Sequence, residues 1–271
     1  MSGPTRIAAA TLLAIVAVSS SLLAQRSDED WLDNCRDDNG NRYEKHCEVK
    51  VFQLGSRSNL DISAGQNGGV EVQSWDRSDI EVHARIQAHG QNTQEARDNA
   101  GEIRIETDGG IIRATGPDMG RRNGWAVSFL ILVPRRMDVE ATTRNGPLSV
   151  KNVSGRMNLD VVNGPLALVG VGGDVTARAE NGPLSVGLTG DRWEGAGLDA
   201  ETRNGPVTIR IPEGYSAELE TGTVNGPLDV SFPLTVTLRG RVPRRIRTTM
   251  GSGGSPVRVV TTNGPASIQR Q

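Results

Sequence analysis

The chain has little aromatic content and few of the residues that most often carry catalysis. Phe, Trp and Tyr make up 3% of its 271 residues, and only three histidines and two cysteines are present. Few bulky side chains together with 33 glycines suit a thin, regular β structure better than a thick globular core. The formal net charge of −2 gives no attraction of the whole molecule to nucleic acid, which we therefore do not expect as a partner.

The residues needed for common enzyme chemistries are also missing. A nucleophile needs a base beside it, yet His46, His83 and His89 all lie in the N-terminal third, and His83 is expected on a solvated strand face. The sequence contains no His/Cys cluster for a metal ion, no Walker-type phosphate loop and no dinucleotide-binding fingerprint. We therefore predict no catalytic, metal-binding or cofactor-binding residues, no cofactor and no enzymatic activity.

The N-terminus is typical of a targeting segment. Arg6 precedes the apolar run Ile7–Val18, and Leu22-Leu23-Ala24 permits cleavage near Gln25. We predict a signal peptide over residues 1–24 and export to the periplasm, the cell surface or the medium. The alternative is an uncleaved N-terminal membrane anchor, because the apolar stretch approaches the length that spans a bilayer.

The two cysteines fall in a polar segment, residues 25–47, that follows the predicted signal peptide. Cys35 and Cys47 are 12 residues apart and flank a polar turn. In an oxidising compartment such a pair is most simply a disulfide, which stabilises by roughly 3 kcal/mol in the chain-entropy model. A metal site with His46 is the alternative, but it lacks ligands for a zinc shell.

Residues 48–271 are predicted to form a single β domain that contains a repeat. The tripeptide Asn-Gly-Pro occurs six times, with spacings of 18, 18, 23, 21 and 38 residues, which indicates a chain of stacked units. The six triplets begin at Asn145, Asn163, Asn181, Asn204, Asn225 and Asn263. Before the repeats, alternating segments predict strands, and Gln91–Gly101 predicts a short helix capped by Asn92.

Burial with a period of two is expected on both sides of each triplet. Apolar residues or threonines recur six, four and two positions before each Asn, and apolar residues recur three and five positions after it, so the parity points the Asn inward. Two architectures share this pattern: a β-solenoid of 18–23-residue coils, and an antiparallel β meander or sandwich. We favour the solenoid because Pro has no N–H to close a tight hairpin turn. The Asn side chains would then stack and hydrogen-bond at the corners.

The last spacing, of 38 residues, is close to two coils. We expect that a coil without its triplet lies around Val242–Arg247.

Two departures from the repeat are the predicted partner surface. One is a patch of five arginines within nine residues: Arg239, Arg241, Arg244, Arg245 and Arg247. The other is the long connection Gly187–Gly197, which carries Trp193 and would form a loop on one face. In the plainer interpretations, the arginines form a solvated loop and Trp193 packs over its own connection.

A polysaccharide-active β-helix enzyme is the main catalytic alternative. It would need clustered carboxylates, and Asp199, Glu201 and Glu220 are expected close together. However, Arg178 and Arg203 alternate with them, which is typical of charge pairing on a solvated face.

The segment Asp61–Ala84, with Gln73-Ser74-Trp75-Asp76-Arg77, and the serial Asn-Gly-Pro-Leu coils resemble the bacterial "putative adhesin" β-strand-repeat family, a domain of unknown function. The resemblance covers roughly residues 48–270. It implies a β-solenoid in the cell envelope or outside the cell, without established catalytic residues.

We therefore expect an exported, non-enzymatic interaction, adhesion or structural module of the bacterial cell envelope. Its partner would be a glycan, a protein or another envelope component. A self-assembling scaffold joined through its open ends is the remaining alternative.

Overall fold

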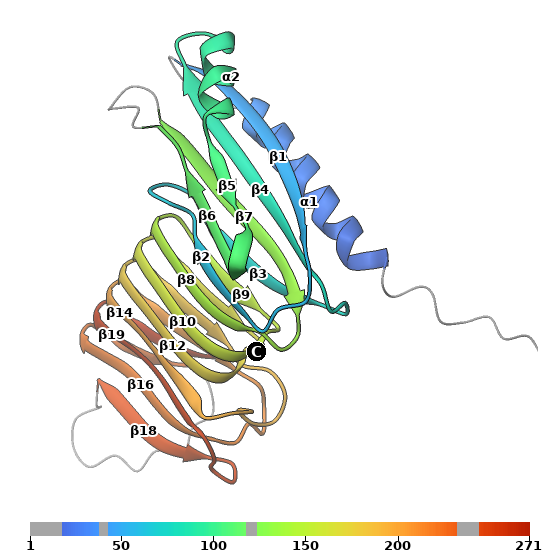
Figure 1. The fold of residues 1–271 in the computed structure, drawn as a ribbon. Coiled ribbons are helices and arrows are strands. Elements are labelled where there is room, and N and C mark those ends of the chain that lie inside the picture. Colours follow the sequence, from blue (N-terminus) through green and yellow to red (C-terminus); the bar gives the residue numbers. More distant parts are fainter. Residues whose placement is uncertain (1–17, 38–42, 118–123, 232–243) are drawn as a thin grey trace, which may run out of the picture.

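The computed structural model describes residues 18–37, 43–117, 124–231 and 244–271 as an all-β fold with two helices and one short 3₁₀ segment, Asp108–Gly110 (Figure 1). Two mixed sheets of ten strands each face one another across the core. Sheet A contains, in spatial order, β1 (Glu44–Leu54), β4 (Ile80–Gly90), β7 (Trp125–Pro134), β3 (Val70–Trp75), β9 (Leu148–Lys151), β11 (Leu166–Val169), β13 (Leu184–Gly187), β15 (Val207–Ile211), β20 (Ala266–Arg270) and β17 (Leu228–Val230). Sheet B contains β18 (Arg245–Met250), β16 (Ala217–Asn225), β19 (Pro256–Asn263), β14 (Gly197–Asn204), β12 (Gly172–Asn181), β10 (Ser154–Asn163), β8 (Asp138–Asn145), β2 (Asn59–Ser63), β6 (Ile111–Thr115) and β5 (Arg104–Glu106). The two-sheet arrangement fits the sheet-based alternative of the sequence prediction.

Each Asn-Gly-Pro repeat contributes one strand to each sheet. The strand that ends at the Asn lies in sheet B, and the strand after the Pro lies in sheet A. Strands of neighbouring repeats pair in parallel and in register, so that Asn145 lies beside Asn163 and Leu148 beside Leu166. Antiparallel pairs lie towards the two ends of the molecule, where β1, β4 and β7 pair in sheet A and β16 and β18 pair in sheet B.

The predicted period-two burial builds the core. Met157 and Leu159 before the second triplet and Leu166 and Leu168 after it are at most 1% exposed. Burying a side chain of this size stabilises the fold by about 1.5–3 kcal/mol, and each repeat supplies several. The inward side chains of both sheets form one continuous cluster.

The corners differ from the prediction in one respect. All six triplet Asn residues are exposed, not inward, because each strand ends at its Asn and the side chain lies in the open corner. The carboxamides nevertheless form a hydrogen-bonded column, in which Asn163 Nδ2 donates to Asn145 Oδ1 and Asn181 Nδ2 to Asn163 Oδ1, both at 3.0 Å. The column also includes Asn67, whose Oδ1 accepts from Asn145 Nδ2 at 3.2 Å.

Backbone hydrogen bonds at the corners run along the stack and not across each turn. Gly146 N donates to Asn163 O at 3.0 Å, and Leu148 N donates to Pro165 O at 2.9 Å. The Pro therefore removes no needed donor. The Gly is required by close stacking, because a Cβ on Gly164 would lie 2.2 Å from the carbonyl oxygen of Gly146.

The expected extra coil near Val242–Arg247 is absent from the described residues. Val242 lies outside them, and Arg245–Met250 form β18, which pairs antiparallel with β16 at the end of sheet B. The sixth repeat returns instead between the fourth and the fifth, because β19 pairs with both β14 and β16. Because β19 pairs in the same register with β14 and with β16, the local strand pairing would look the same if the sixth repeat simply followed the fifth.

The two helices lie at the N-terminal end of the stack. The predicted short helix is α2 (Thr93–Gly101), capped by Asn92, whose Oδ1 accepts from Glu95 N at 2.9 Å. Helix α1 (Val18–Asp37), which was not predicted, lies alongside β1 and β4 (Figure 1) and spans the expected signal-peptide boundary at residue 24. In the described part of the chain, neither helix is long and apolar enough to cross a bilayer.

Candidate functional site

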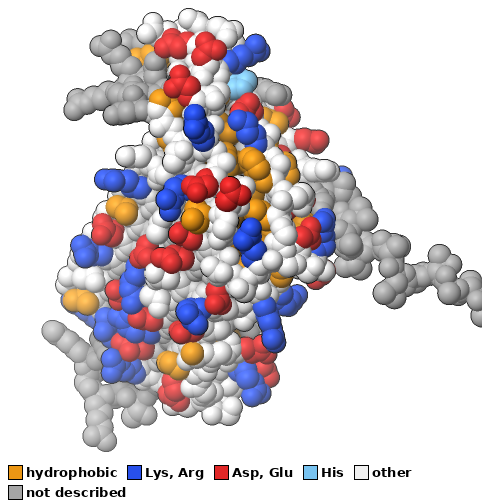
Figure 2. Space-filling model, in the orientation of Figure 1, with side chains coloured by type: hydrophobic (Ala, Val, Ile, Leu, Met, Phe, Trp, Pro, Cys, Tyr) orange, Lys and Arg blue, Asp and Glu red, His pale blue; other side chains and the backbone are white. Residues whose placement is uncertain are grey.

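The outer face of sheet B is a grid of outward side chains. Residues one, three and five positions before each Asn point away from the core, and the parallel register places equivalent positions side by side on adjacent strands. Asp160, Arg178 and Glu201 form one such row across β10, β12 and β14. In Figure 2 acidic and basic side chains intermingle over this part of the molecule, with only isolated hydrophobic ones.

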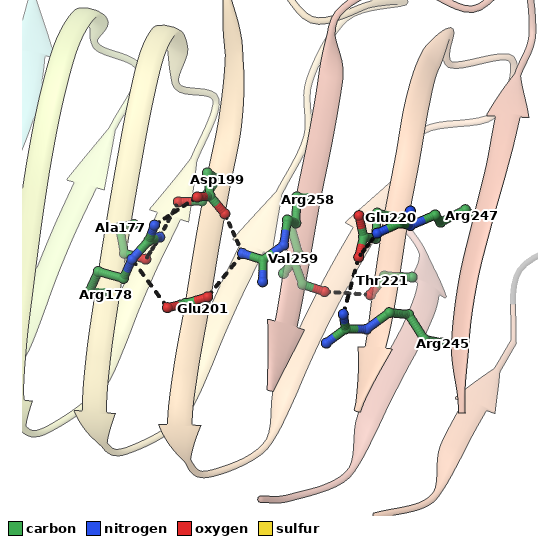
Figure 3. A network of polar contacts seen from close by, with 10 residues as sticks. All are labelled: Ala177, Arg178, Asp199, Glu201, Glu220, Thr221, Arg245, Arg247, Arg258 and Val259. Atoms are coloured by element: carbon green, nitrogen blue, oxygen red, sulfur yellow. Dashed lines mark hydrogen bonds and ion pairs between the residues drawn. The ribbon is translucent and has the colours of Figure 1, made fainter. Parts of the chain in front are cut away.

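Four of these side chains form a ring of ion pairs (Figure 3). Arg178 reaches Asp199 Oδ2 at 2.7 Å and Glu201 Oε1 at 3.3 Å. Arg258, delivered by β19, contacts Glu201 Oε2 at 3.0 Å and also pairs with Asp199. The expected charge pairing of Arg178 with these carboxylates is therefore present, whereas the second arginine is Arg258 and not Arg203.

The ring favours the ionised form of Asp199. Burial alone would raise the pKa of Asp199, but hydrogen bonds from Arg178 and Arg258 outweigh it and hold that pKa below its usual value. A carboxyl group held in its charged form cannot donate a proton near neutral pH, which is what a glycosidase general acid must do.

Glu220 of β16 is the register partner of Arg258 in the ring, but its own ion pairs are with other arginines. Arg245 and Arg247 of β18 contact Glu220 at 3.4 and 3.1 Å (Figure 3). The predicted cluster of three carboxylates is therefore split into two groups, and each group is neutralised by arginines. Among the described residues, no group of His, Cys, Asp and Glu side chains could hold a metal ion.

The predicted arginine patch is only partly within the described residues. Arg239 and Arg241 lie outside them. Arg244 donates to the carbonyl of Val224 at 3.1 Å, and Arg245 and Arg247 pair with Glu220. These three arginines thus contact residues of β16 and stabilise the end of sheet B, although the side chain of Arg247 remains 75% exposed.

Trp193 does not present a binding surface. Its side chain is buried, and its indole N–H donates to the carbonyl of Gly173 at 3.1 Å. Trp193 belongs to the main core cluster, so its side chain packs inward and its hydrogen bond goes to the preceding repeat. The sequence could not decide this, because the same long connection suits a loop folded inward or outward.

A shallow hollow of about 310 Å³ lies beside the ring on the same face. Its lining includes Asp160, Glu180, Arg203, Thr262 and Val162, from four adjacent strands. Asp160, Glu180 and Arg203 have no hydrogen-bond or ion-pair partner in the described part of the chain, unlike their neighbours in the ring. The hollow therefore combines free acceptors, a free guanidinium donor, a hydroxyl and a small apolar surface.

A second polar cluster is buried beneath α1. His83 is 2% exposed, which contradicts the expectation of a solvated residue, because α1 covers this part of sheet A. His83 Nδ1 contacts Asp28 of α1 at 2.5 Å and Nε2 contacts Glu81 at 2.8 Å, while Arg85 Nε donates to Asp28 at 2.8 Å. The local alternation of β4 correctly places His83 away from the core but carries no signal of the helix.

The hydrogen bonds of this cluster set its charge. Burial would lower the pKa of His83, but contacts with Asp28 and Glu81 outweigh burial and raise that pKa above its usual value. Burial would raise the pKa of Asp28, but hydrogen bonds from His83 and Arg85 lower it. The cluster thus favours a positive His83 between two carboxylates.

The predicted disulfide is present. Cys35 of α1 is bonded to Cys47 of β1, so the C-terminal part of the helix is covalently joined to sheet A. Nearer the N-terminal end of α1, Ala24 packs with Trp75, Leu130 and Leu132 in a small apolar cluster separate from the main core. Helix α1 is therefore held by a covalent, an ionic and an apolar contact.

Comparisons with known proteins give likenesses to solved structures only. No family model and no curated protein matches the chain. A structure described as a putative cell adhesion protein from Clostridium sporogenes aligns with 84% of this chain and all of its own, at 10% identity and a TM-score of 0.46. A "putative adhesin" from Bacteroides fragilis aligns with 83% of this chain and 97% of its own, at 12% identity and a TM-score of 0.31. A "putative lipid binding protein" from Parabacteroides distasonis aligns with 86% and 98%, at 10% identity and a TM-score of 0.28.

Proposed function

We propose that the chain is an exported, non-enzymatic module of the bacterial cell envelope that binds glycans through the outer face of sheet B. In this proposal the six repeats form a β-solenoid. The parallel register of adjacent repeats, the Asn column and the hydrogen bonds that run along the stack support that architecture. Stacked repeats of this kind provide an extended, rigid surface on which ligand contacts can recur.

The observation that carries the proposal is the hollow beside the ion-pair ring. A sugar ring offers hydroxyl groups that donate to carboxylates and accept from guanidinium groups, and it also has apolar C–H faces. Asp160, Glu180 and Arg203 supply the free polar groups, and Val162, which is 38% exposed, supplies an apolar contact. A hollow of about 310 Å³ falls at the lower end of the range for small-ligand sites, which suits one or two sugar units.

The charge arrangement supports binding without cleavage. A glycosidase needs one carboxyl group that is protonated and a second that is ionised, at a fixed separation. Asp199 and Glu201 are both bound by arginines, and the pKa of Asp199 is lowered. The polysaccharide-active enzyme is therefore the weaker alternative.

Export is supported by the N-terminal sequence and by the disulfide, since such bonds persist in oxidising compartments. Fractionation of the producing cells, followed by intact mass measurement of the purified chain, tests this part. We expect the chain in the envelope or the medium, with Cys35 and Cys47 oxidised. A reduced chain confined to the cytoplasm would contradict the proposal.

Binding is tested with the exported chain on immobilised envelope polysaccharides and a glycan array. The informative variant combines Asp160→Asn with Arg203→Gln, which removes two charges in the hollow. Asn keeps the size of Asp160, and Gln is shorter than Arg203 but stays polar. Arg210→Gln is the matched control, because Arg210 is an exposed arginine on the opposite sheet. We expect lost binding in the hollow variant, retained binding in the control and unchanged polysaccharide length. Equal binding by both variants, or shortened polysaccharide, would refute the proposal.

A further inference from the structure

The order of strands differs from the order of repeats at the C-terminal end of the stack. Four repeats follow one another in space, but the fifth lies one position further on. Both strands of the sixth repeat fill the resulting slot: β19 lies between β14 and β16, and β20 lies between β15 and β17. The final part of the chain therefore completes both sheets at once.

Both walls of the slot present the same register to its occupant. On one wall Gly205 N donates to Asn263 O at 2.9 Å, and on the other Gly264 N donates to Asn225 O at 3.1 Å. The side chains match as well, because Asn263 Nδ2 donates to Asn204 while Asn225 Nδ2 donates to Asn263, both at 2.9 Å. The slot therefore specifies one further Asn-Gly-Pro repeat as its occupant.

The occupant is deeply buried but lies next to a glycine-rich connection. Val257, Val259 and Ile268 are completely buried. The turn 251–255 joins β18 to β19, and Gly251, Gly253 and Gly254 adopt positive φ values of 54°, 77° and 133°. Glycine takes such values without steric cost and also tolerates extended ones. If extended, these five residues span roughly 17 Å, which is enough to carry β19 away from its own slot.

We propose that the segment 256–271 of one copy occupies the slot of a second copy, so that the chain self-associates by strand exchange. Every contact in the exchanged form is one that already exists within a single chain. The two forms therefore differ mainly in the conformation of the turn 251–255 and in the entropy lost on association. A higher protein concentration offsets that loss. Reciprocal exchange gives a closed dimer, whereas one-way exchange gives an open chain of copies.

Exchange at this slot differs from simple pairing of sheet edges. At the other end of sheet A, edge strand β1 places Glu48 and Lys50 opposite Ile86 and Ala84, two positions that face the core. Charged side chains on the inward side of an edge strand oppose edge-to-edge association. The C-terminal slot has no unpaired strand edges only while β19 and β20 occupy it.

The test uses full-length chains with single cysteine substitutions on the outer face of sheet A. Thr208 and Ser267 are register partners on β15 and β20, and both are half-buried, small and polar. Thr208→Cys and Ser267→Cys chains, one of them tagged, are unfolded in urea without reductant, mixed, refolded and treated with a short thiol cross-linker. Thr208→Cys mixed with Ser149→Cys is the matched control, because Ser149 lies on β9 in the same row, three strands from Thr208.

We expect a cross-linked heterodimer from the first mixture, with a yield that rises roughly in proportion to total protein concentration. The control mixture should give none above background. The double variant Thr208→Cys/Ser267→Cys should cross-link within one chain, which checks the register of the slot. A first mixture that yields no more heterodimer than the control would overturn the proposal. So would failure of the double variant to cross-link, since the slot would then not have this register.

Discussion

The carboxamide of Asn263 donates a hydrogen bond to Asn204 at 2.9 Å, although 59 residues separate them in the chain. Asn225, which precedes Asn263 by 38 residues, lies on its other side. The Asn residues of the column therefore follow the spatial order of the repeats, which differs from their order in the sequence. Because each inner Asn acts as both donor and acceptor, the column also couples neighbouring repeats.

Removing an inner member of the column should cost more than removing the last. Asn181→Ala loses the hydrogen bonds to Asn163 and from Asn204, whereas Asn225→Ala loses only its bond to Asn263. At about 1 kcal/mol for each bond, we expect losses of about 2 and 1 kcal/mol in the free energy of unfolding, measured with urea. Equal losses would show that the carboxamides do not act as a column.

The corner glycines should not tolerate a methyl group. The Cβ of a Gly164→Ala chain would lie 2.2 Å from a backbone carbonyl oxygen of the preceding repeat, so the strands would have to separate. We expect a loss of about 3 kcal/mol or more. Gly101→Ala is the control, because no atom lies within 4 Å of its added Cβ and alanine favours the helix. A similar free energy of unfolding for both variants would argue against close stacking at the corner.

The cluster under α1 should make stability depend on pH. The folded pKa of His83 is raised above 6.5, so its contribution is complete below pH 6.5 and is lost as the pH rises through the folded pKa. The folded pKa of Asp28 is lowered below 3.8, so its contribution is present above that pH and is lost on acidification. Urea unfolding between pH 5.5 and 9 should show falling stability, and His83→Gln should flatten that slope. An equal slope in both chains would remove His83 as its cause.

The disulfide should stabilise the N-terminal end in particular. Replacing Cys35 and Cys47 by serine should cost about 3 kcal/mol of unfolding free energy. Hydrogen exchange of the backbone amides locates the effect, because α1 should lose protection before the repeats do. Uniform loss of protection along the chain would show that α1 and the repeats unfold together.

The repeat was predictable from sequence because its rules are local. Alternation around each triplet identifies Met157 and Leu166 as core residues, and the lack of an N–H in Pro indicates that the stack, not the turn, uses the hydrogen bonds. The same rule placed Asn163 on the inward side, and it failed because the strand ends at that residue.

The parts that could not be predicted depend on distant segments. His83 is buried by a helix 55 residues earlier in the chain, and no pattern in β4 indicates that cover. The position of Asn263 in the stack was equally unpredictable, because the sixth repeat can pair in the same register at either of two positions in the stack. In the candidate site, Arg178 was expected among the carboxylates, whereas Arg258 lies there only because β19 returns to a place beside β14.

The central claim, that the hollow on sheet B binds a glycan, is tested most directly by carbodiimide labelling of carboxylates, read by mass spectrometry with and without glycan. Asp160 and Glu180 line the hollow, whereas Glu213 is exposed and pairs with Arg270 elsewhere. We expect a bound glycan to protect Asp160 and Glu180 from labelling and to leave the labelling of Glu213 unchanged. Labelling of Asp160 and Glu180 that stays the same while the glycan is bound would contradict it.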